Sequence, residues 1–153
     1  MKNGALAVFL ALLSVFAVVA SGCGGQETAA ELFSKGQQAF SEGRYDDAAG
    51  LYREGLEKQP DSSAGYNLLG MAYRFQNHQA GGVSHREKEE AAFRKAVELD
   101  PGNATAHVNL GATLFYAGRK EEAARYLKKA LEVYPNHPDR VSIEDLIKQS
   151  ESR

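Results

Sequence analysis

The pattern of apolar and polar positions predicts paired helices through most of the chain. Between residues 29 and 136, apolar residues recur at helical spacing within polar, Ala-rich stretches. In the last of these stretches, Leu110 and Leu114 lie four residues apart, as do Leu127 and Leu131. Each pair therefore falls on one stripe of its helix, and we expect the two stripes to face each other across an antiparallel helix pair.

Three prolines punctuate this pattern. Pro60, Pro101 and Pro135 each follow an Ala-rich helical stretch, and proline cannot continue a helix because it lacks the N–H group. Pro101 and Pro135 lie 34 residues apart, whereas Pro60 and Pro101 lie 41 apart. The recurrence indicates an internal repeat, and the seven additional residues indicate an insertion in the middle unit.

The third repeat has the clearest motif. Its key positions are spaced as His107-x2-Leu110-Gly111-x2-Leu114, then Ala123-x3-Leu127-x2-Ala130, then Pro135. We expect Gly111 and Ala123 where the two helices approach most closely, because only small side chains fit there. Residues 118–120 are the expected turn, and Glu121 and Glu122 favour the start of the second helix.

This motif resembles the tetratricopeptide repeat (TPR) family, whose pattern has an aromatic residue, Leu-Gly, a second aromatic, Ala-x3-Phe and Pro. His107 and Leu114 replace the two aromatic residues. The resemblance implies an all-α fold of three helix-turn-helix hairpins, which form a short right-handed solenoid closed by a C-terminal capping helix. It also implies a surface that holds other proteins, and not an enzyme.

The second repeat matches the family at both ends and departs from it in the middle. It has Tyr66-x2-Leu69-Gly70-x2-Tyr73, and later Phe93 and Pro101. The insertion is expected near residues 77–83, and the capping-box spacing of Ser84 and Glu87 predicts a second helix that begins at His85. Glu89 stands where the flanking repeats have Ala48 and Ala123, so we expect the insertion to open the helix pair locally.

The first repeat diverges most, as expected of a terminal repeat with one solvated face. Lys35 replaces the expected Leu, Ala39 replaces an aromatic residue, and residues 42–45 supply the turn. The predicted repeat boundaries are 29–62, 63–103 and 104–136, followed by a capping helix and tail at 137–153. In the capping helix, the residues expected to point inward are the apolar ones: Val141, Ile143, Leu146 and Ile147.

Residues 1–22 have the features of a secretory signal peptide. Lys2 precedes an apolar run from Ala5 to Ala20 that is interrupted only by Ser14. The run is shorter than the roughly 20 residues that cross a bilayer, and it ends in small residues rather than in charged ones.

Cys23, the only cysteine, follows these small residues in a placement that resembles a bacterial lipobox. Ala20 stands where the lipobox usually has Leu. The resemblance implies lipidation of Cys23 and a tether at 23–28 whose five residues after the cysteine span at most about 18 Å. Two alternatives stay open: cleavage that leaves a soluble protein with a free thiol, and an uncleaved anchor.

Lipidation implies a bacterial cell-envelope location, at the outer membrane or the periplasmic face of the inner membrane. Gly24, rather than Asp, follows the cysteine, which is compatible with transfer to the outer membrane.

Charge and residue spacing argue against nucleic-acid binding and catalysis. The 18 basic and 20 acidic residues are interspersed, without a basic block to neutralise phosphates. Adjacent carboxylates such as Asp46 and Asp47 diverge by about 100° on a helix and cannot share a proton. We therefore predict no catalytic residue, no metal, no cofactor and no small-molecule substrate. One alternative is a metal bound by His78 and His85 beside the insertion.

The family resemblance places the partner-binding residues on the first helix of each hairpin, which builds the concave face. The matching residues are Phe33, Gln37, Phe40, Asn67, Met71, Arg74, Thr105, Val108, Ala112 and Phe115. This set is unusually apolar, and it lacks the lysines and asparagines with which some TPR proteins clamp a terminal carboxylate. It suits an extended peptide or an amphipathic helix. The alternative is that some of these residues only pack against neighbouring repeats or the C-terminal helix.

The sequence therefore predicts a lipid-anchored TPR adaptor of the bacterial envelope that holds a protein partner on its concave face. A second hypothesis is a soluble periplasmic or secreted enzyme accessory whose function lies in the inserted loop. A third is a homo-oligomeric structural protein, in which the groove takes the C-terminal helix of a neighbouring copy.

Overall fold

The computed structural model describes residues 27–79 and 85–152, and in these ranges the chain forms seven helices and no strand. The predicted signal peptide, the lipidation site Cys23 and the tether up to residue 26 lie outside the described residues. The helices are α1 (Ala29–Ser41), α2 (Tyr45–Lys58), α3 (Ser63–Gln79), α4 (Arg86–Leu99), α5 (Ala104–Tyr116), α6 (Lys120–Val133) and α7 (Arg140–Glu151). The predicted all-α fold is confirmed.

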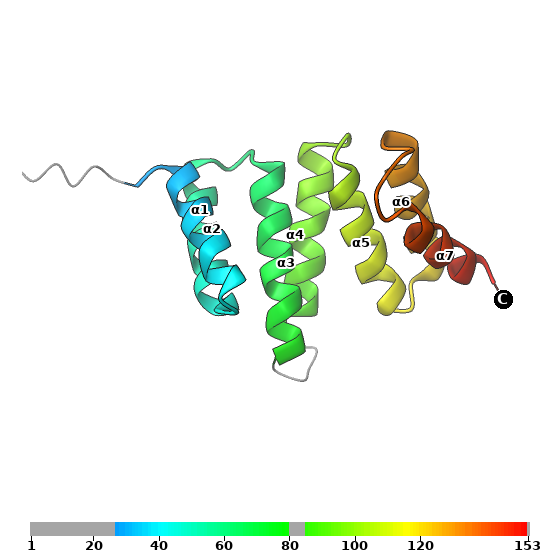
Figure 1. The fold of residues 1–153 in the computed structure, drawn as a ribbon, viewed down its shortest axis with the longest axis horizontal. Helices are drawn as coiled ribbons and strands as arrows, with labels where there is room; N and C mark the ends of the chain where they lie inside the picture. Colours follow the sequence, from blue (N-terminus) through cyan, green and yellow to red (C-terminus); the bar gives the residue numbers. More distant parts are fainter. Residues whose placement is uncertain (1–26, 80–84, 153) are drawn as a thin grey trace, which may run out of the picture.

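The first six helices form three hairpins that stand side by side, and α7 packs at the end of the row (Figure 1). Helices α1, α3 and α5 lie on one side of the row, with α2, α4 and α6 behind them (Figure 1). We call the first side the α1–α3–α5 face. It is the side that the sequence predicted to be concave.

A glycine in the first helix of each hairpin lets the second helix approach closely. A Cβ atom at Gly111 would lie 2.7 Å from Leu127 Cγ and 3.3 Å from the Ala123 carbonyl oxygen. A Cβ at Gly70 would lie 2.6 Å from Phe93 Cε1. The distances of 2.6 and 2.7 Å are shorter than real Cβ contacts, so the repeated Leu-Gly motif reflects packing within the hairpin. The predicted close approach at Gly111 is confirmed.

In the described part of the chain, two clusters of buried apolar residues lie along the row of helices. The first joins repeats one and two and includes Tyr52, Leu56 and Leu69. The second joins repeats two and three, and its members are Phe93, Leu110, Leu114 and Ala123. Because each cluster spans two hairpins, no hairpin buries its apolar stripe alone.

Two tight turns close the first and third hairpins as predicted. Gly43 lies at φ 76° between α1 and α2, and Gly118 lies at φ 80° between α5 and α6. Residues with a side chain rarely adopt this left-handed region, which explains a glycine at both positions.

The insertion in the second hairpin lengthens a helix, contrary to the expectation of a loop from residue 77. Helix α3 continues to Gln79 and is 17 residues long, against 13 for α1 and α5. Helix α4 then begins at Arg86, one residue later than predicted, and the Asn77 side chain accepts a hydrogen bond from the His85 N–H at 2.6 Å. The proposed capping residue Ser84 lies outside the described residues.

Glu89 does not require an opened helix pair, so that expectation was wrong. Its side chain is buried, with 5% of the residue exposed, and it accepts a hydrogen bond from Arg74 Nε on α3 at 2.8 Å. The hydroxyl of Thr113 on α5 lies 2.8 Å from the same carboxylate oxygen. A carboxylate with such partners can occupy a position where the other repeats bury alanine.

The capping helix α7 buries fewer apolar residues than predicted. Ile143 is 1% exposed, and Leu146 and Ile147 are half-buried. Val141, expected to point inward, is 73% exposed. Residues two positions apart on a helix point about 200° apart, so Val141 and Ile143 cannot both face the core.

No helix in the two described ranges is long and apolar enough to cross a bilayer.

Candidate functional site

The α1–α3–α5 face carries all ten residues predicted to bind a partner. Three lie on α1, three on α3 and four on α5. None of the ten is fully buried: Gln37 and Thr105 are exposed, and the other eight are half-buried. The structure therefore brings these residues to one side of the helix row and leaves each of them partly accessible.

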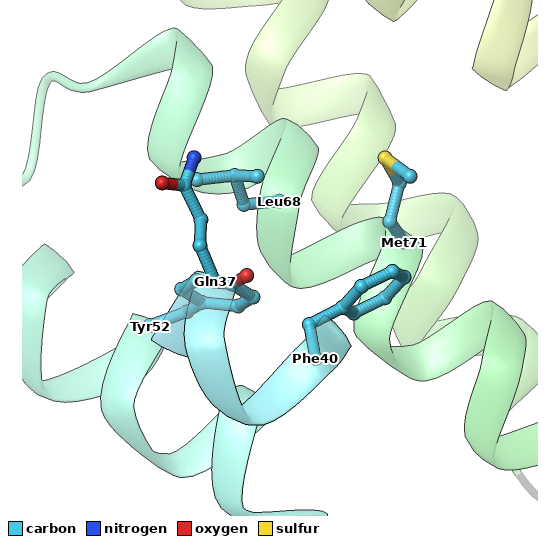
Figure 2. Close-up of a pocket in the computed structure, with 5 residues that line it drawn as sticks. All are labelled: Gln37, Phe40, Tyr52, Leu68 and Met71. Carbon is cyan, nitrogen blue, oxygen red and sulfur yellow. The ribbon is translucent and has the colours of Figure 1, made fainter. Parts of the chain in front are cut away.

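An open, largely apolar recess lies on this face between the first two repeats (Figure 2). It has a volume of about 80 Å³. Gln37 and Phe40 from α1, Tyr52 from α2, and Leu68 and Met71 from α3 line it. Three of these five residues belong to the predicted set, whereas Tyr52 and Leu68 do not.

The sequence signals for these two additional residues point to other roles. Tyr52 occupies the large-residue position of the Ala-x3-Phe motif, which indicates a core residue. Leu68 directly precedes the Leu69-Gly70 pair. Their place in the recess follows from the way α3 packs against the first hairpin, which a single-repeat pattern does not contain.

Phe40 is held at the recess by an aromatic cluster. Its ring centroid lies 5.1 Å from that of Tyr45 on α2 and 5.1 Å from that of Phe75 on α3, both in edge-on geometry. The rings of Tyr45 and Phe75 are also 5.1 Å apart. Such pairs stabilise each other beyond their buried area, so one wall of the recess is preorganised.

Phe33 packs between neighbouring repeats, which is the alternative role given above for some residues of this set. Its ring fills the space beside two glycines, and a Cβ at either Gly55 or Gly65 would lie 2.7 Å from it. These glycines belong to α2 and α3. Phe33 therefore joins the first two hairpins and offers only part of its ring to the face.

Arg74 is engaged inside the protein. Its guanidinium donates to Glu89 at 2.8 Å, to the side chain and carbonyl of Asn109 at 3.1 and 2.9 Å, and to Thr113 at 2.9 Å. It also lies 4.8 Å from the centroid of the Phe93 ring. These bonds tie α3 to α4 and α5, so Arg74 positions the helices of the face.

Asn67 belongs to the same polar junction. Its side-chain oxygen accepts a hydrogen bond from Asn109 Nδ2 at 2.9 Å. Two of the three predicted residues on α3 are therefore bound to α5, and Met71 is the one that lines the recess.

The third repeat contributes four of the predicted residues, and none of them lines the recess. Phe115 packs edge-on against Tyr116, with ring centroids 5.4 Å apart, and the ammonium of Lys120 lies 6.0 Å from its centroid. Val108 and Ala112 are half-buried, and Thr105 is exposed.

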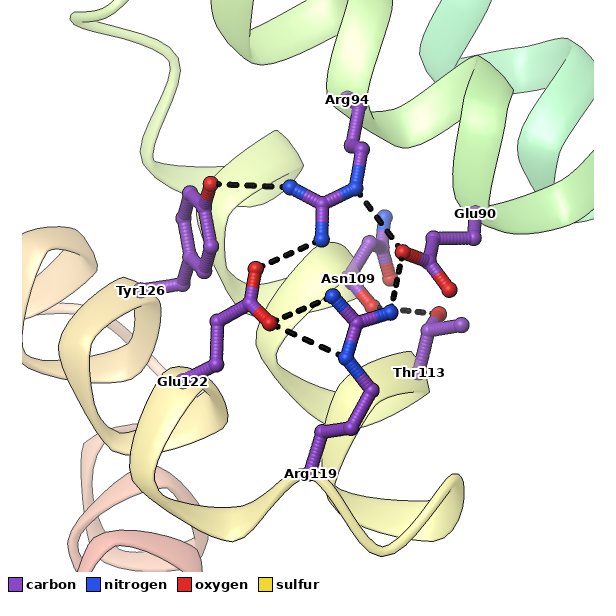
Figure 3. A network of polar contacts seen from close by, with 7 residues as sticks. All are labelled: Glu90, Arg94, Asn109, Thr113, Arg119, Glu122 and Tyr126. Carbon is purple, nitrogen blue, oxygen red and sulfur yellow. Dashed lines mark hydrogen bonds and ion pairs between the residues drawn. The ribbon is translucent and has the colours of Figure 1, made fainter. Parts of the chain in front are cut away.

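A ring of ion pairs joins α4 to the third hairpin (Figure 3). Arg94 donates to Glu90 at 2.8 Å and to Glu122 at 2.6 Å, and Arg119 binds the same two carboxylates. Hydrogen bonds from Arg94 hold the pKa of Glu122 below its ordinary value. Tyr126 adds a hydrogen bond by accepting from Arg94 at 3.2 Å. The two arginines and two glutamates are mutually neutralised, so we assign this network to the junction of repeats two and three.

The histidines do not form a metal site in the described part of the chain. Within residues 27–79 and 85–152, no group of three or more His, Cys, Asp or Glu residues is placed to hold a metal ion. His78 is exposed, whereas His85 stacks on Tyr73 with ring centroids 6.1 Å apart. His107 is buried, and its Nε2 lies 3.0 Å from the Pro101 carbonyl oxygen.

Comparison with known families agrees with the geometry. Models described as "Tetratricopeptide repeat" match residues 33–81 and 104–137. The chain belongs to the tetratricopeptide repeat family. The matched segments cover most of the first hairpin, all of α3 and the third hairpin, and the first of them extends into the predicted insertion at 77–83.

Solved TPR structures share the fold at low sequence identity. The first TPR of Spaghetti (RPAP3), bound to the HSP90 peptide SRMEEVD, has a TM-score of 0.71 and 24% identity over 82% of this chain and 94% of that one. The TPR2B domain of yeast Sti1, in a pHsp70 complex, has a TM-score of 0.70 and 19% identity over 80% of this chain and 94% of that one.

Curated relatives are much longer proteins. Human protein O-mannosyl-transferase TMTC2 is 28% identical over 107 residues, which are 68% of this chain and 12% of that protein. Mouse sperm-associated antigen 1 is 31% identical over 103 residues, which are 67% of this chain and 10% of that protein. The chain thus spans about a tenth of the length of these two relatives.

Proposed function

We propose that this TPR protein is an adaptor that binds a segment of a partner protein on its α1–α3–α5 face. The observation that carries the proposal is the recess between α1 and α3, together with ten face residues of which none is fully buried. A concave or grooved helix face with apolar anchors suits an extended peptide or an amphipathic helix.

The structural relatives support a peptide as the bound partner. The Spaghetti domain is bound to an HSP90 peptide, and the Sti1 domain is in a complex with pHsp70. They share their fold with this chain, and the same helix arrangement offers the same kind of face here. The side chains on that face decide which peptide fits.

We also propose that the adaptor is lipid-anchored at Cys23 in the bacterial cell envelope. The support is the sequence: an apolar run that ends in small residues immediately before the one cysteine. The folded part begins close to that cysteine. Thr28 caps α1 by accepting a hydrogen bond from the Glu31 N–H at 3.2 Å, and Glu31 accepts one from the Thr28 N–H at 2.7 Å.

A tether of residues 24–28 extends at most about 18 Å, so an anchored domain would hold its partner next to the membrane. Replacement of Cys23 by Ser tests the anchor. We expect the variant to lose incorporation of a radioactive fatty acid, and unchanged labelling would contradict the proposal.

Affinity capture tests the adaptor function. The intact chain, solubilised from membranes, should enrich a specific protein that a Phe40→Ala, Met71→Ala, Phe115→Ala variant does not enrich. Circular dichroism of the variant must first show the wild-type helix content. Equal enrichment by both chains would contradict the proposal that the partner binds on this face.

A further inference from the structure

The recess between the first two repeats has the size of an aliphatic side chain. An apolar cavity of about 150 Å³ accommodates a benzene ring. The recess has about half that volume, at 80 Å³. Its walls are the aromatic rings of Phe40 and Tyr52 and the aliphatic chains of Leu68 and Met71. The volume and the lining therefore favour Leu, Ile, Val or Met over an aromatic residue.

None of the five side chains that line the recess is cationic. On α2, Arg53 and Lys58 are exposed and do not line it. On α1, Lys35 is paired with Glu27. On α3, Arg74 is paired with Glu89, whose carboxylate is buried. Helix α5 contains no Lys or Arg. An acidic side chain or a terminal carboxylate that entered the recess would lose water and meet no compensating cation.

Gln37 supplies a polar group at the rim. It is exposed, and its carboxamide makes no hydrogen bond with any residue in the part of the chain that the structure describes. A carboxamide can both donate and accept, which matches the N–H and C=O of one residue in an extended peptide. The backbone of a bound segment can therefore pair with Gln37 while its side chain enters the recess.

We infer that the recess lined by Gln37, Phe40, Tyr52, Leu68 and Met71 is a specificity pocket for one aliphatic side chain of an uncharged, extended segment of the partner protein. The inference rests on the proposed function and narrows it. The recess selects an aliphatic side chain by size, and it rejects acidic residues because none of its lining side chains is cationic. Gln37 fixes the backbone of the bound segment.

Methionine NMR provides a direct probe, because the chain has only two methionines, Met1 and Met71. In the full chain with ¹³C-labelled methionine methyl groups, the Met71 signal reports on the recess. N-acetyl-leucine methylamide should shift this signal saturably. N-acetyl-aspartate methylamide and N-acetyl-phenylalanine methylamide should bind at least fivefold more weakly.

Two neighbouring glutamines give a matched pair of variants. Gln37→Phe places a ring at the rim of the recess and should weaken binding of the leucine probe at least fivefold. Gln38, the next residue on α1, is also exposed and does not line the recess, so Gln38→Phe should stay within twofold of the wild type. Both positions are exposed, and neither substitution disturbs the core.

Three results would overturn the inference. The first is equal binding of the aspartate and leucine probes, and the second is an equal loss of affinity for the leucine probe in the two glutamine variants. The third is a shift of the Met71 signal on dilution of the protein without any probe, because a second copy of the chain would then occupy the recess. If a partner still crosslinks to the α1–α3–α5 face in any of these cases, the adaptor function stands and only the pocket assignment falls.

Discussion

The guanidinium of Arg74 and the carboxylate of Glu89 form a largely buried ion pair, with Nε and Oε1 2.8 Å apart. The pair joins the two helices of the second repeat at the position where the other repeats bury an alanine. Thr113 and Asn109 connect it to α5, so one polar cluster sets the relative positions of α3, α4 and α5.

Removal of one partner from this pair should destabilise the protein strongly. Glu89→Ala leaves the Arg74 charge uncompensated in the interior, and such changes cost about 3–5 kcal/mol. Urea unfolding followed by circular dichroism measures the free energy of unfolding. Glu98→Ala is the control, because Glu98 forms a surface pair with Lys95 and its loss should cost less than about 1 kcal/mol. Equal effects of the two substitutions would contradict the assigned role.

Two Gly→Ala substitutions should have opposite effects. At Gly111 the new methyl group would lie 2.7 Å from Leu127, and overpacking of this kind costs about 1–3 kcal/mol. At Gly50, inside α2, it would meet no atom within 4 Å, and the helix should gain about 0.5–1 kcal/mol. Thermal melts of both variants test this, and a stabilising Gly111→Ala would refute the close helix approach.

Alkaline pH should weaken the first hairpin through Tyr52. Burial raises the pKa of Tyr52 to about 12 from 10.0, and the residue is 1% exposed. Because the folded-state pKa is raised, the stabilisation is fully present below pH 10 and is lost as the pH rises toward about 12. Unfolding titrations at pH 8 to 12 should show this loss in the wild type and a smaller one in Tyr52→Phe. Identical curves would place Tyr52 in contact with solvent.

The peptide SRMEEVD, which is bound to the Spaghetti domain, should bind this chain poorly. The peptide carries three acidic side chains and a terminal carboxylate, whereas the cations on α1 and α3 are already paired. Fluorescence anisotropy should show at least tenfold weaker binding than to the Spaghetti domain measured in parallel. Comparable affinity would mean that Arg74 or Lys35 exchanges its partner for the peptide.

Local patterns in the sequence predicted the repeats well. The helix ends at the prolines, the close approach at Gly111 and the turns at Gly43 and Gly118 all follow from contacts within one hairpin. The capping box of Thr28 and Glu31 also follows a local sequence signal, Thr-x-x-Glu.

Features that depend on contacts between repeats could not be predicted in this way. Glu89 is accommodated by Arg74 from α3 and Thr113 from α5, and the latter lies 24 residues away in the chain. The recess combines residues of α1, α2 and α3, so no single repeat contains its pattern. The prediction that Val141 points inward was wrong, because Val141 is apolar but lies on the opposite side of the helix from Ile143.

Site-specific photocrosslinking in the cells that make the protein tests the central claim most directly. Benzoylphenylalanine placed at Thr105, an exposed residue of the α1–α3–α5 face that does not line the recess, should crosslink to a partner protein. Placed at Arg53 on α2 or Arg125 on α6, both also exposed, it should give no crosslink to that protein. Crosslinks to a partner from Arg53 and Arg125, with none from Thr105, would contradict the account.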